Sequence, residues 1–179
     1  MTLHKSCEMQ LPAWLDDFID DWNEPLETIE QRMHLAVTLA AENVKHHTGG
    51  PFGAIVVEDD SNRLLSVGVN LVTSVELSLA HAEMVAVSLA QSAIGSWNLG
   101  STGGAQLVTS CEPCAMCFGA VQRNPQPAIR GGKRQRAHQA VRVHHIDHRR
   151  FLDIKKCRIE QRPAEHLVIA HGLGDMIHP

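Results

Sequence analysis

His81-Ala82-Glu83 and, thirty residues further along, Pro113-Cys114-Ala115-Met116-Cys117 decide the fold of this chain. Among these residues, His81, Cys114 and Cys117 offer one imidazole and two thiols, which are donors that zinc prefers in proteins. A catalytic zinc ion has three protein ligands and an open fourth position for water. The two stretches therefore predict a hydrolytic site that holds one zinc ion (Zn2+) per chain.

Both stretches are predicted to open helices. In a helix over residues 112–121, Cys114 and Cys117 are three positions apart and lie about 60° from one another on one face. Pro113 fits the first turn of this helix, where its missing N–H costs nothing. Residues 81–93 carry apolar side chains along one side and predict a second helix. Two helix N-termini, whose free N–H groups favour thiolates and other anions, then face one cation.

Glu83 is predicted to be the general acid–base residue rather than a ligand. It follows His81 by two positions, roughly 200° around a regular helix, and so does not share the face of the histidine. In the first turn, its carboxylate can still reach a water molecule at the open position of the metal. This placement suits a group that takes up a proton and returns it.

Other uses of the cysteines stay open at this point. Cys111 adds a third thiol at the same spacing, which would also suit a closed structural zinc site of four ligands with Cys114, Cys117 and His81. Cys111 precedes the proline, however, and its thiol is expected to point elsewhere. A thioredoxin-like redox pair is disfavoured because the C-x-x-C motif lacks the matching strand–helix context.

Length and composition indicate one core and no membrane span. The chain has 179 residues, of which 44% are hydrophobic, enough for one sizeable core. No apolar run approaches the ~18 residues of a transmembrane helix, and the first residues lack the apolar block of a signal peptide. The five cysteines are an odd number, and three of them cluster, which favours reduced thiols. We therefore expect a cytoplasmic protein with no membrane partner.

The periodicity of apolar residues predicts an alternating α/β order. An apolar stripe at helical spacing follows Asn23, which is a plausible N-cap. Two buried-strand patterns separated by a polar turn then predict a hairpin. The expected elements are, in order, a helix, two strands, a helix, a strand and a helix, over residues 24–45, 52–58, 64–69, 81–93, 106–109 and 112–121.

These motifs resemble those of the zinc-dependent cytidine and deoxycytidylate deaminase superfamily. The resemblance spans residues 26–121, and H-x-E followed by P-C-x-x-C is the motif pair of zinc deaminases. Within the nucleobase and tRNA-adenosine deaminase branch, the chain is most similar to bacterial guanine deaminases. The resemblance implies a three-layer α/β/α cytidine deaminase-like fold with a mixed central sheet. The stretches that carry the resemblance to the superfamily are Pro51-Phe52-Gly53-Ala54, Gly68-Val69-Asn70, Ala80-His81-Ala82-Glu83-Met84 and Thr109-Ser110-Cys111-Glu112-Pro113-Cys114-Ala115-Met116-Cys117. The likeness to guanine deaminases is carried by residues 79–89 and 107–121 and by the preceding Leu11-Pro12-Ala13-Trp14-Leu15.

The activity implied by the resemblance is hydrolytic removal of an exocyclic amine from a nucleobase, with guanine giving xanthine and ammonia. Glu83 would carry a proton from water to a ring nitrogen and a second one to the leaving amine. Asn70 is similar to the base-reading asparagine of the family, whose amide pairs with a base edge as donor and acceptor. Gly53 and Ala54, with small side chains, would leave room for a flat purine. The expected substrate-binding set also includes Phe52, Ala82 and Ser110.

Three other functions are alternatives to guanine deamination. Within the family, they are deamination of tRNA adenosine or of cytidine. Outside catalysis, the alternative is a zinc-binding protein of this fold with little activity. A nucleic-acid partner is not expected, because residues 1–121 hold four Lys and Arg against fifteen Asp and Glu. The resemblance implies a homodimer that binds a small-molecule nucleobase.

The last third of the chain does not fit the resemblance. Residues 122–179 hold twelve Lys and Arg against five Asp and Glu, and Pro125 and Pro127 stand where a helix end and a strand are expected. Codons for residues 122–128, read one nucleotide later, can encode the family-like Ser-Gly-Ile-Arg-Ser-Leu. We hypothesise a frameshift at about Val121, which would remove later strands of the sheet and an acidic lid.

The sequence therefore predicts three segments. Residues 1–22 form an N-terminal extension, residues 23–121 the zinc-dependent deaminase core, and residues 122–179 an atypical basic tail that derives from a frameshift.

Overall fold

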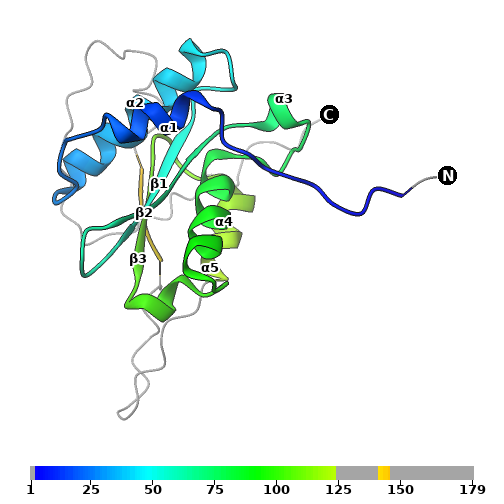
Figure 1. Ribbon diagram of the computed structural model, residues 1–179. Helices are drawn as coiled ribbons and strands as arrows, with labels where there is room; N and C mark the ends of the chain where they lie inside the picture. The colour runs from blue at the N-terminus through cyan, green and yellow to red at the C-terminus, as the bar shows by residue number, and fades with distance from the viewer. Residues whose placement is uncertain (1–2, 124–140, 146–179) are drawn as a thin grey trace, which may run out of the picture.

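The structure is a computed structural model that describes residues 3–123 and 141–145. Figure 1 shows a central sheet with α1 and α2 on one face and α4 and α5 on the other. The elements are α1 (Trp14–Asp20), α2 (Ile29–Lys45), β1 (Gly53–Glu58), β2 (Leu64–Val69), α3 (Val72–Val75), α4 (Ala82–Ile94), the 3-10 helix η1 (Leu99–Thr102), β3 (Ala105–Thr109), α5 (Ala115–Gln122) and β4 (Val141–His145).

The sheet is mixed, with the strand order β2-β1-β3-β4. Strand β1 is antiparallel to both β2 and β3, whereas β3 and β4 are parallel. Gly53 at the start of β1 lies opposite Val69 at the end of β2, and Ala54 lies opposite Thr109 at the end of β3. The loops before β1, after β2 and after β3 therefore meet at one end of the sheet, where these strands begin or finish.

Alternation along β1 divides the core into two layers. Ile55 and Val57 belong to the cluster that contains Leu35 and Leu39 of α2. Their neighbours Ala54 and Val56 belong to the cluster that contains Ala82 and Ala86 of α4. Successive residues of a strand point to opposite faces, so β1 buries both of its faces between helices. The predicted three-layer α/β/α fold with a mixed sheet is confirmed.

Helix α2 begins at residue 29 rather than at the expected residue 24. Thr28 is its N-cap, and its hydroxyl accepts a hydrogen bond from the Gln31 N–H at 3.3 Å. The Gln31 side-chain oxygen in turn accepts from the Thr28 N–H at 2.9 Å. This capping box satisfies two N–H groups that a helix start otherwise leaves unbonded. The prediction that Asn23 caps the helix is wrong, because the capping pair lies one turn later.

The two helices near the cysteines and histidine also begin later than expected. Cys114 is the N-cap of α5, so Pro113 precedes the helix instead of occupying its first turn. His81 is likewise the N-cap of α4. Both N-cap residues have an extended backbone, with φ and ψ of −67° and 170° at Cys114 and of −67° and 151° at His81.

Four elements were not predicted, namely α1, α3, η1 and β4. Strand β4 pairs with β3 from Ala105↔Val141 to Thr109↔His145, so the expectation that the sheet lacks strands after Val121 is wrong. Val141 and Val143 are β-branched residues at alternate positions, a local strand preference that the prolines earlier in the tail obscured. The three-segment division stays a prediction, and the other residues beyond 123 lie outside the described part.

Among the residues described, no helix combines the length and apolar character needed to cross a membrane.

Strand β2 and helix α4 approach one another closely at Gly68. A Cβ atom at this position would lie 2.2 Å from the Ala82 carbonyl oxygen and 2.6 Å from the Ala86 nitrogen. The Ser66 hydroxyl, two residues earlier, donates to the Ala86 carbonyl at 2.6 Å. The absence of a side chain at Gly68 therefore sets how near the start of α4 lies to the sheet.

We expect Gly68→Ala to lower the free energy of unfolding by about 1–3 kcal/mol, because the added methyl group overlaps the backbone of α4. Urea unfolding of the two proteins measures the difference. Gly119→Ala in α5 is the matched control, since no atom lies within 4 Å of a Cβ placed there. Equal stability of Gly68→Ala and the unsubstituted chain would contradict the close packing of α4 on β2.

Candidate active site

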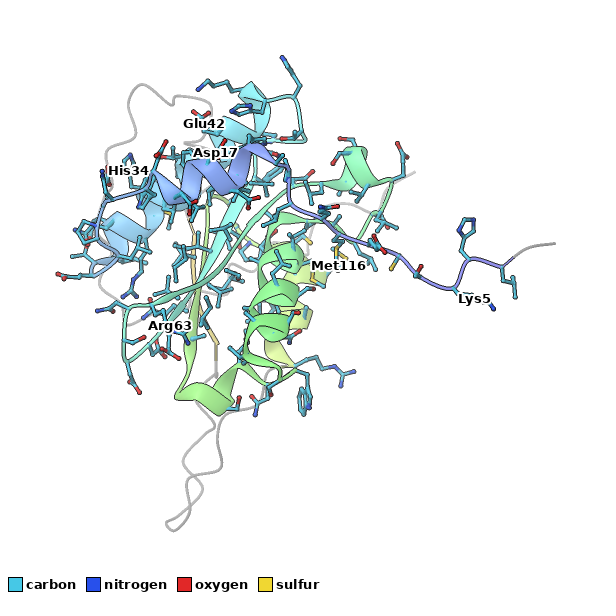
Figure 2. The ribbon with its side chains drawn as sticks, in the orientation of Figure 1. Lys5, Asp17, His34, Glu42, Arg63 and Met116 are labelled. Atoms are coloured by element: carbon cyan, nitrogen blue, oxygen red, sulfur yellow. The ribbon has the colours of Figure 1, made fainter. Side chains whose placement is uncertain are left out.

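The starts of α4 and α5 bring together the side chains of the two sequence motifs. His81 and Cys114 are N-cap residues, yet neither side chain makes the hydrogen bond to the helix backbone that N-cap side chains usually make. Cys117 lies one turn into α5 and is buried. Figure 2 labels Met116, which lies beside this cysteine on the α4 and α5 side of the sheet. Three donors that have no capping role therefore face one point.

The three ligand atoms are spaced as a tetrahedral zinc site requires. The Cys114 and Cys117 sulfurs lie 3.6 Å apart, and they lie 3.7 Å and 3.6 Å from His81 Nδ1. Zinc–sulfur bonds of about 2.3 Å and zinc–nitrogen bonds of about 2.0–2.1 Å at tetrahedral angles separate such ligands by roughly 3.6–3.8 Å. The residues present fit a zinc ion with one open position.

Cys111 is not part of this group. The ligand atoms of His81, Cys114 and Cys117 all lie within 4.8 Å of one another, and no other group of this kind occurs among the described residues. The Cys111 thiol instead lies 3.6 Å from the carbonyl oxygen of Glu112. The structure therefore gives no support to the closed site of four ligands.

The electrostatics of the group favour a cation. Burial raises the pKa of the Cys117 thiol well above its ordinary value, and the negative charge of Glu83 raises it further. Glu83 itself is only 8% exposed. A buried thiol beside a buried carboxylate resists ionisation, whereas a divalent cation reverses this preference and binds the thiolate.

The second part of the candidate site lies at the end of the sheet where β2 and β3 finish and β1 begins. Asn70 follows β2 directly and is 9% exposed. Its N–H donates to the Phe52 carbonyl at 3.0 Å, and its own carbonyl accepts from the Asn43 side chain at 2.9 Å. Within residues 3–123 and 141–145, no hydrogen bond engages the side-chain amide of Asn70. The backbone of this residue is therefore fixed on both sides by hydrogen bonds.

Ser110 and Gly53 are bonded to one another at the same end of the sheet. The Ser110 hydroxyl accepts from the Gly53 N–H at 3.0 Å, and the Ser110 N–H donates to the Gly53 carbonyl at 2.9 Å. A Cβ at Gly53 would lie 2.3 Å from the Ala36 carbonyl of α2. The small size of Gly53 therefore serves the packing of α2, and its expected role of making room for a purine stays a prediction. Ala54, on the α4 side, is fully buried.

Residues 26–128, more than half of the chain, match the cytidine and deoxycytidylate deaminase zinc-binding region. The chain belongs to this family.

Its relatives include guanine deaminases. The chain is 44% identical over 86 residues to the guanine deaminase of Bacillus subtilis, a match that covers 48% of this chain and 52% of that protein. A solved guanine deaminase from Nitrosomonas europaea has a TM-score of 0.63 and 30% identity, with 81% and 91% of the two chains covered. A solved complex with 2,6-diaminopurine has a TM-score of 0.60 and 39% identity, with 65% and 62% covered. The chain spans about half the length of the curated relatives it matches.

Sequence reasoning missed Asn43, which holds the carbonyl of Asn70 from α2. Asn43 is fully buried and follows Ala36 and Ala40 on the buried side of the helix, seven and three positions later. A polar residue on an apolar helical stripe was the available signal, because a buried amide requires hydrogen-bond partners. The sequence does not say which partners those are.

We expect Cys114→Ser to lose zinc, because it removes one of the three ligands. Cys111→Ser should keep about one zinc ion per chain, because its thiol lies outside the ligand group. Elemental analysis of the purified full chains measures both. Zinc retained in Cys114→Ser and lost in Cys111→Ser would overturn the assignment of ligands.

Removing the metal should make stability depend on pH through Cys117. In the unfolded chain, this thiol titrates near its ordinary pKa of about 8.5, whereas burial raises its pKa in the folded chain. As the pH rises through that value, the unfolded state releases a proton that the folded state keeps, so unfolding becomes more favourable. We expect the metal-free protein to have a lower free energy of unfolding at about pH 9.5 than at about pH 7.5.

Urea unfolding after chelation measures this difference, and metal-free Cys117→Ala is the control for all other titrating groups. The variant should show a smaller loss of stability over the same pH interval. The same loss in both proteins would assign the pH dependence to groups other than Cys117.

Proposed function

We propose that this protein is a zinc-dependent hydrolytic deaminase that converts guanine and water to xanthine and ammonia. The observation that carries the proposal is the joint placement of a zinc-spaced ligand group and a buried carboxylate, Glu83, beside Cys117. Similarity to guanine deaminases and to a complex with 2,6-diaminopurine supports a purine base as the substrate.

His81, Cys114 and Cys117 would hold the zinc ion. Zinc bound there supplies Lewis acidity, which lets water act as a nucleophile near neutral pH. Glu83 is the second residue of α4, two positions after His81. Its carboxylate lies close enough to Cys117 to raise the pKa of that thiol. From this position Glu83 would take one proton from water and give it to a ring nitrogen. It would then take the second proton from the hydroxyl added to the ring carbon and give it to the amine, which leaves as ammonia.

Asn70 would orient the base. Its amide offers a donor and an acceptor side by side, which is the pattern needed to pair with the edge of a purine. The backbone groups of Asn70 are both bonded, so the amide can bind a base without first ordering the chain. The remaining substrate contacts that we propose come from Phe52, Ala54, Ala82 and Ser110.

Deamination of adenosine in tRNA is the second candidate, because tRNA-specific adenosine deaminases also match the chain. That of Bacillus subtilis is 39% identical over 71 residues and the chloroplastic one of Arabidopsis thaliana is 30% identical over 111 residues, both below the 44% identity to the guanine deaminase. The four Lys and Arg of residues 1–121 make a poor surface for a phosphate backbone. We therefore favour a small-molecule base. From the likeness to guanine deaminases, we propose that the protein is a homodimer. From its free cysteines, we propose that it works in the cytoplasm.

Ammonia release from guanine, from cytidine and from an adenosine-bearing RNA hairpin separates these candidates. We expect guanine to be preferred by specificity constant. A preference for cytidine or the hairpin would refute the choice of base while keeping a deaminase. Zinc at one ion per chain with no ammonia from any of the three would favour the zinc-binding protein with little activity.

We expect Glu83→Gln to keep its zinc and to lower deamination by at least about 10²–10⁴-fold, because an amide cannot carry the proton. Zinc content and initial rates on guanine measure the two effects. Glu112→Gln is the matched control, since this exposed carboxylate lies two residues before Cys114 and should change neither value appreciably. Near-normal turnover of Glu83→Gln would assign the proton transfer to another group.

A further inference from the structure

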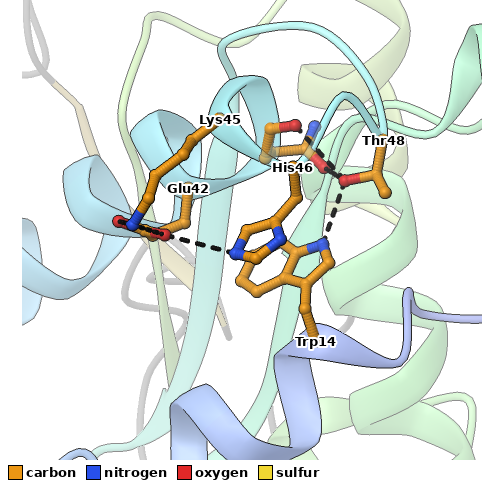
Figure 3. A network of polar contacts seen from close by, with 6 residues as sticks. Trp14, Glu42, Lys45, His46 and Thr48 are labelled. Atoms are coloured by element: carbon orange, nitrogen blue, oxygen red, sulfur yellow. Dashed lines mark hydrogen bonds and ion pairs between the residues drawn. The ribbon is translucent and has the colours of Figure 1, made fainter.

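A chain of hydrogen bonds links helix α1 to the backbone of Asn70. The Trp14 indole nitrogen lies 3.0 Å from the Thr48 hydroxyl, which lies 2.7 Å from Asn43 Oδ1. The Asn43 amide nitrogen then lies 2.9 Å from the carbonyl oxygens of both Gly50 and Asn70. Figure 3 shows the outer part of this network, with the Trp14 indole directed at Thr48.

The direction of every proton in this chain is fixed by its two ends. An indole N–H can only donate, and a backbone carbonyl can only accept. Thr48 therefore accepts from Trp14 and donates to Asn43, whose Oδ1 is nearer at 2.7 Å than its backbone carbonyl at 3.3 Å. The NH2 group of Asn43 faces the carbonyls of Gly50 and Asn70, which can only accept. Both hydrogens of this NH2 group are used, which leaves one orientation for an amide that is fully buried.

The inner end of the network holds Asn70 tightly. A Cβ at Gly49 would lie 1.8 Å from the Asn70 carbonyl oxygen, so the loop after α2 is pressed against that residue. The Asn70 N–H is held by the Phe52 carbonyl at 3.0 Å, beyond the same loop. Asn43 thus fixes the carbonyl of Asn70 and also bonds the loop after α2 at Gly50. This loop leads to Phe52, whose carbonyl fixes the N–H of Asn70.

The outer end of the network is held by ring stacking. The Trp14 indole and the His46 imidazole are nearly parallel, with centroids 4.9 Å apart and an interplanar angle of 5°. His46 Nε2 lies 3.4 Å from a carboxylate oxygen of Glu42, which also pairs with Lys45 at 2.9 Å. These contacts keep the indole nitrogen directed at Thr48 (Figure 3).

We propose that Asn43 is a positioning residue that sets the orientation of Asn70 for base binding, and that Trp14 and Thr48 hold Asn43 in place. This inference rests on the proposed function, in which Asn70 pairs with the base. Trp14 lies before residue 26, where the family match begins. A residue outside the family match therefore belongs to the support of the substrate-binding end of the sheet.

Thr48→Val tests this proposal, because valine has nearly the shape of threonine but neither accepts from Trp14 nor donates to Asn43. Thr48→Ser restores a hydroxyl. Thr38→Val is the matched control on α2, since the Thr38 hydroxyl bonds the His34 carbonyl within the helix. Two quantities are measured on the zinc-loaded full chain, the exchange rate of the Asn70 amide hydrogen by NMR and the affinity for 2,6-diaminopurine. The affinity is measured in the Glu83→Gln background to prevent turnover.

We expect Thr48→Val to weaken binding of 2,6-diaminopurine by about 5- to 30-fold, the range for one lost buried hydrogen bond. The Asn70 amide should exchange at least about 10-fold faster. Thr48→Ser and Thr38→Val should stay within about twofold in both quantities. In an Asn70→Ala background, Thr48→Val should cost less than about twofold in affinity, because its effect passes through Asn70.

Unchanged exchange at Asn70 in Thr48→Val would overturn the proposal, whatever the affinity. An equal loss of affinity in the Asn70→Ala background would also overturn it, because Thr48 would then act by another route. Absence of purine binding in the parent protein would refute the proposed function instead, and the exchange rates would still decide whether this network positions Asn70.

Discussion

The convergence of two helix starts on one point is the constraint on which the rest of this structure depends. The ligand atoms of His81, Cys114 and Cys117 come within 4.8 Å of one another only because α4 and α5 both begin at the same end of the sheet. Helix α4 reaches that position by lying directly on β2, where Gly68 removes the side chain that would keep it away. An N-cap residue has an extended backbone and projects its side chain at the helix end, so His81 and Cys114 can serve as ligands without distorting either helix.

The opposite layer supports the proposed base-binding residue by the same means. Gly53 lets the backbone of α2 approach β1, as Gly68 does for α4 and β2. Asn43, near the end of α2, then reaches the carbonyls of Gly50 and Asn70. The metal group thus comes from the α4 and α5 layer, whereas the proposed base-binding residue follows β2 in the sheet and is held from α2 on the other face. Interiors packed at this density transmit a shift in either helix to the site.

The features that could be predicted from the sequence were those set by neighbours along the chain. The ligand group followed from the spacing of Cys114 and Cys117 and from the apolar pattern after His81, and the structure places these atoms together. Gly53 shows the limit of such reasoning, because a small residue suits either a ligand or a close helix, and the approach of Ala36 appears only in the tertiary structure. Asn43 was missed for the same reason, since its partners lie on a loop and a strand end. The start of α2 was misplaced because acidic residues before Thr28 imitate a first turn, while the capping box is a more local signal that was overlooked.

The residues that break local rules in this chain are those of the candidate site. Two N-cap side chains make no capping bond, a buried thiol lies beside a buried carboxylate, and the amide of Asn70 makes no hydrogen bond with the described residues. The second arrangement costs stability in a chain without ligands, because a thiolate beside a carboxylate is unfavourable when both are buried. A bound ligand can satisfy each of these groups. A cation relieves the conflict of Cys117 with Glu83 and binds the two N-cap side chains, and a base edge satisfies the amide. A fold that held these groups for stability alone would have paired them internally, as it does with Asn43, whose amide hydrogens are both bonded. The two asparagines therefore differ: the side-chain amide of Asn43 is fully bonded and supports Asn70, whereas the amide of Asn70 is open for the base that we propose it binds.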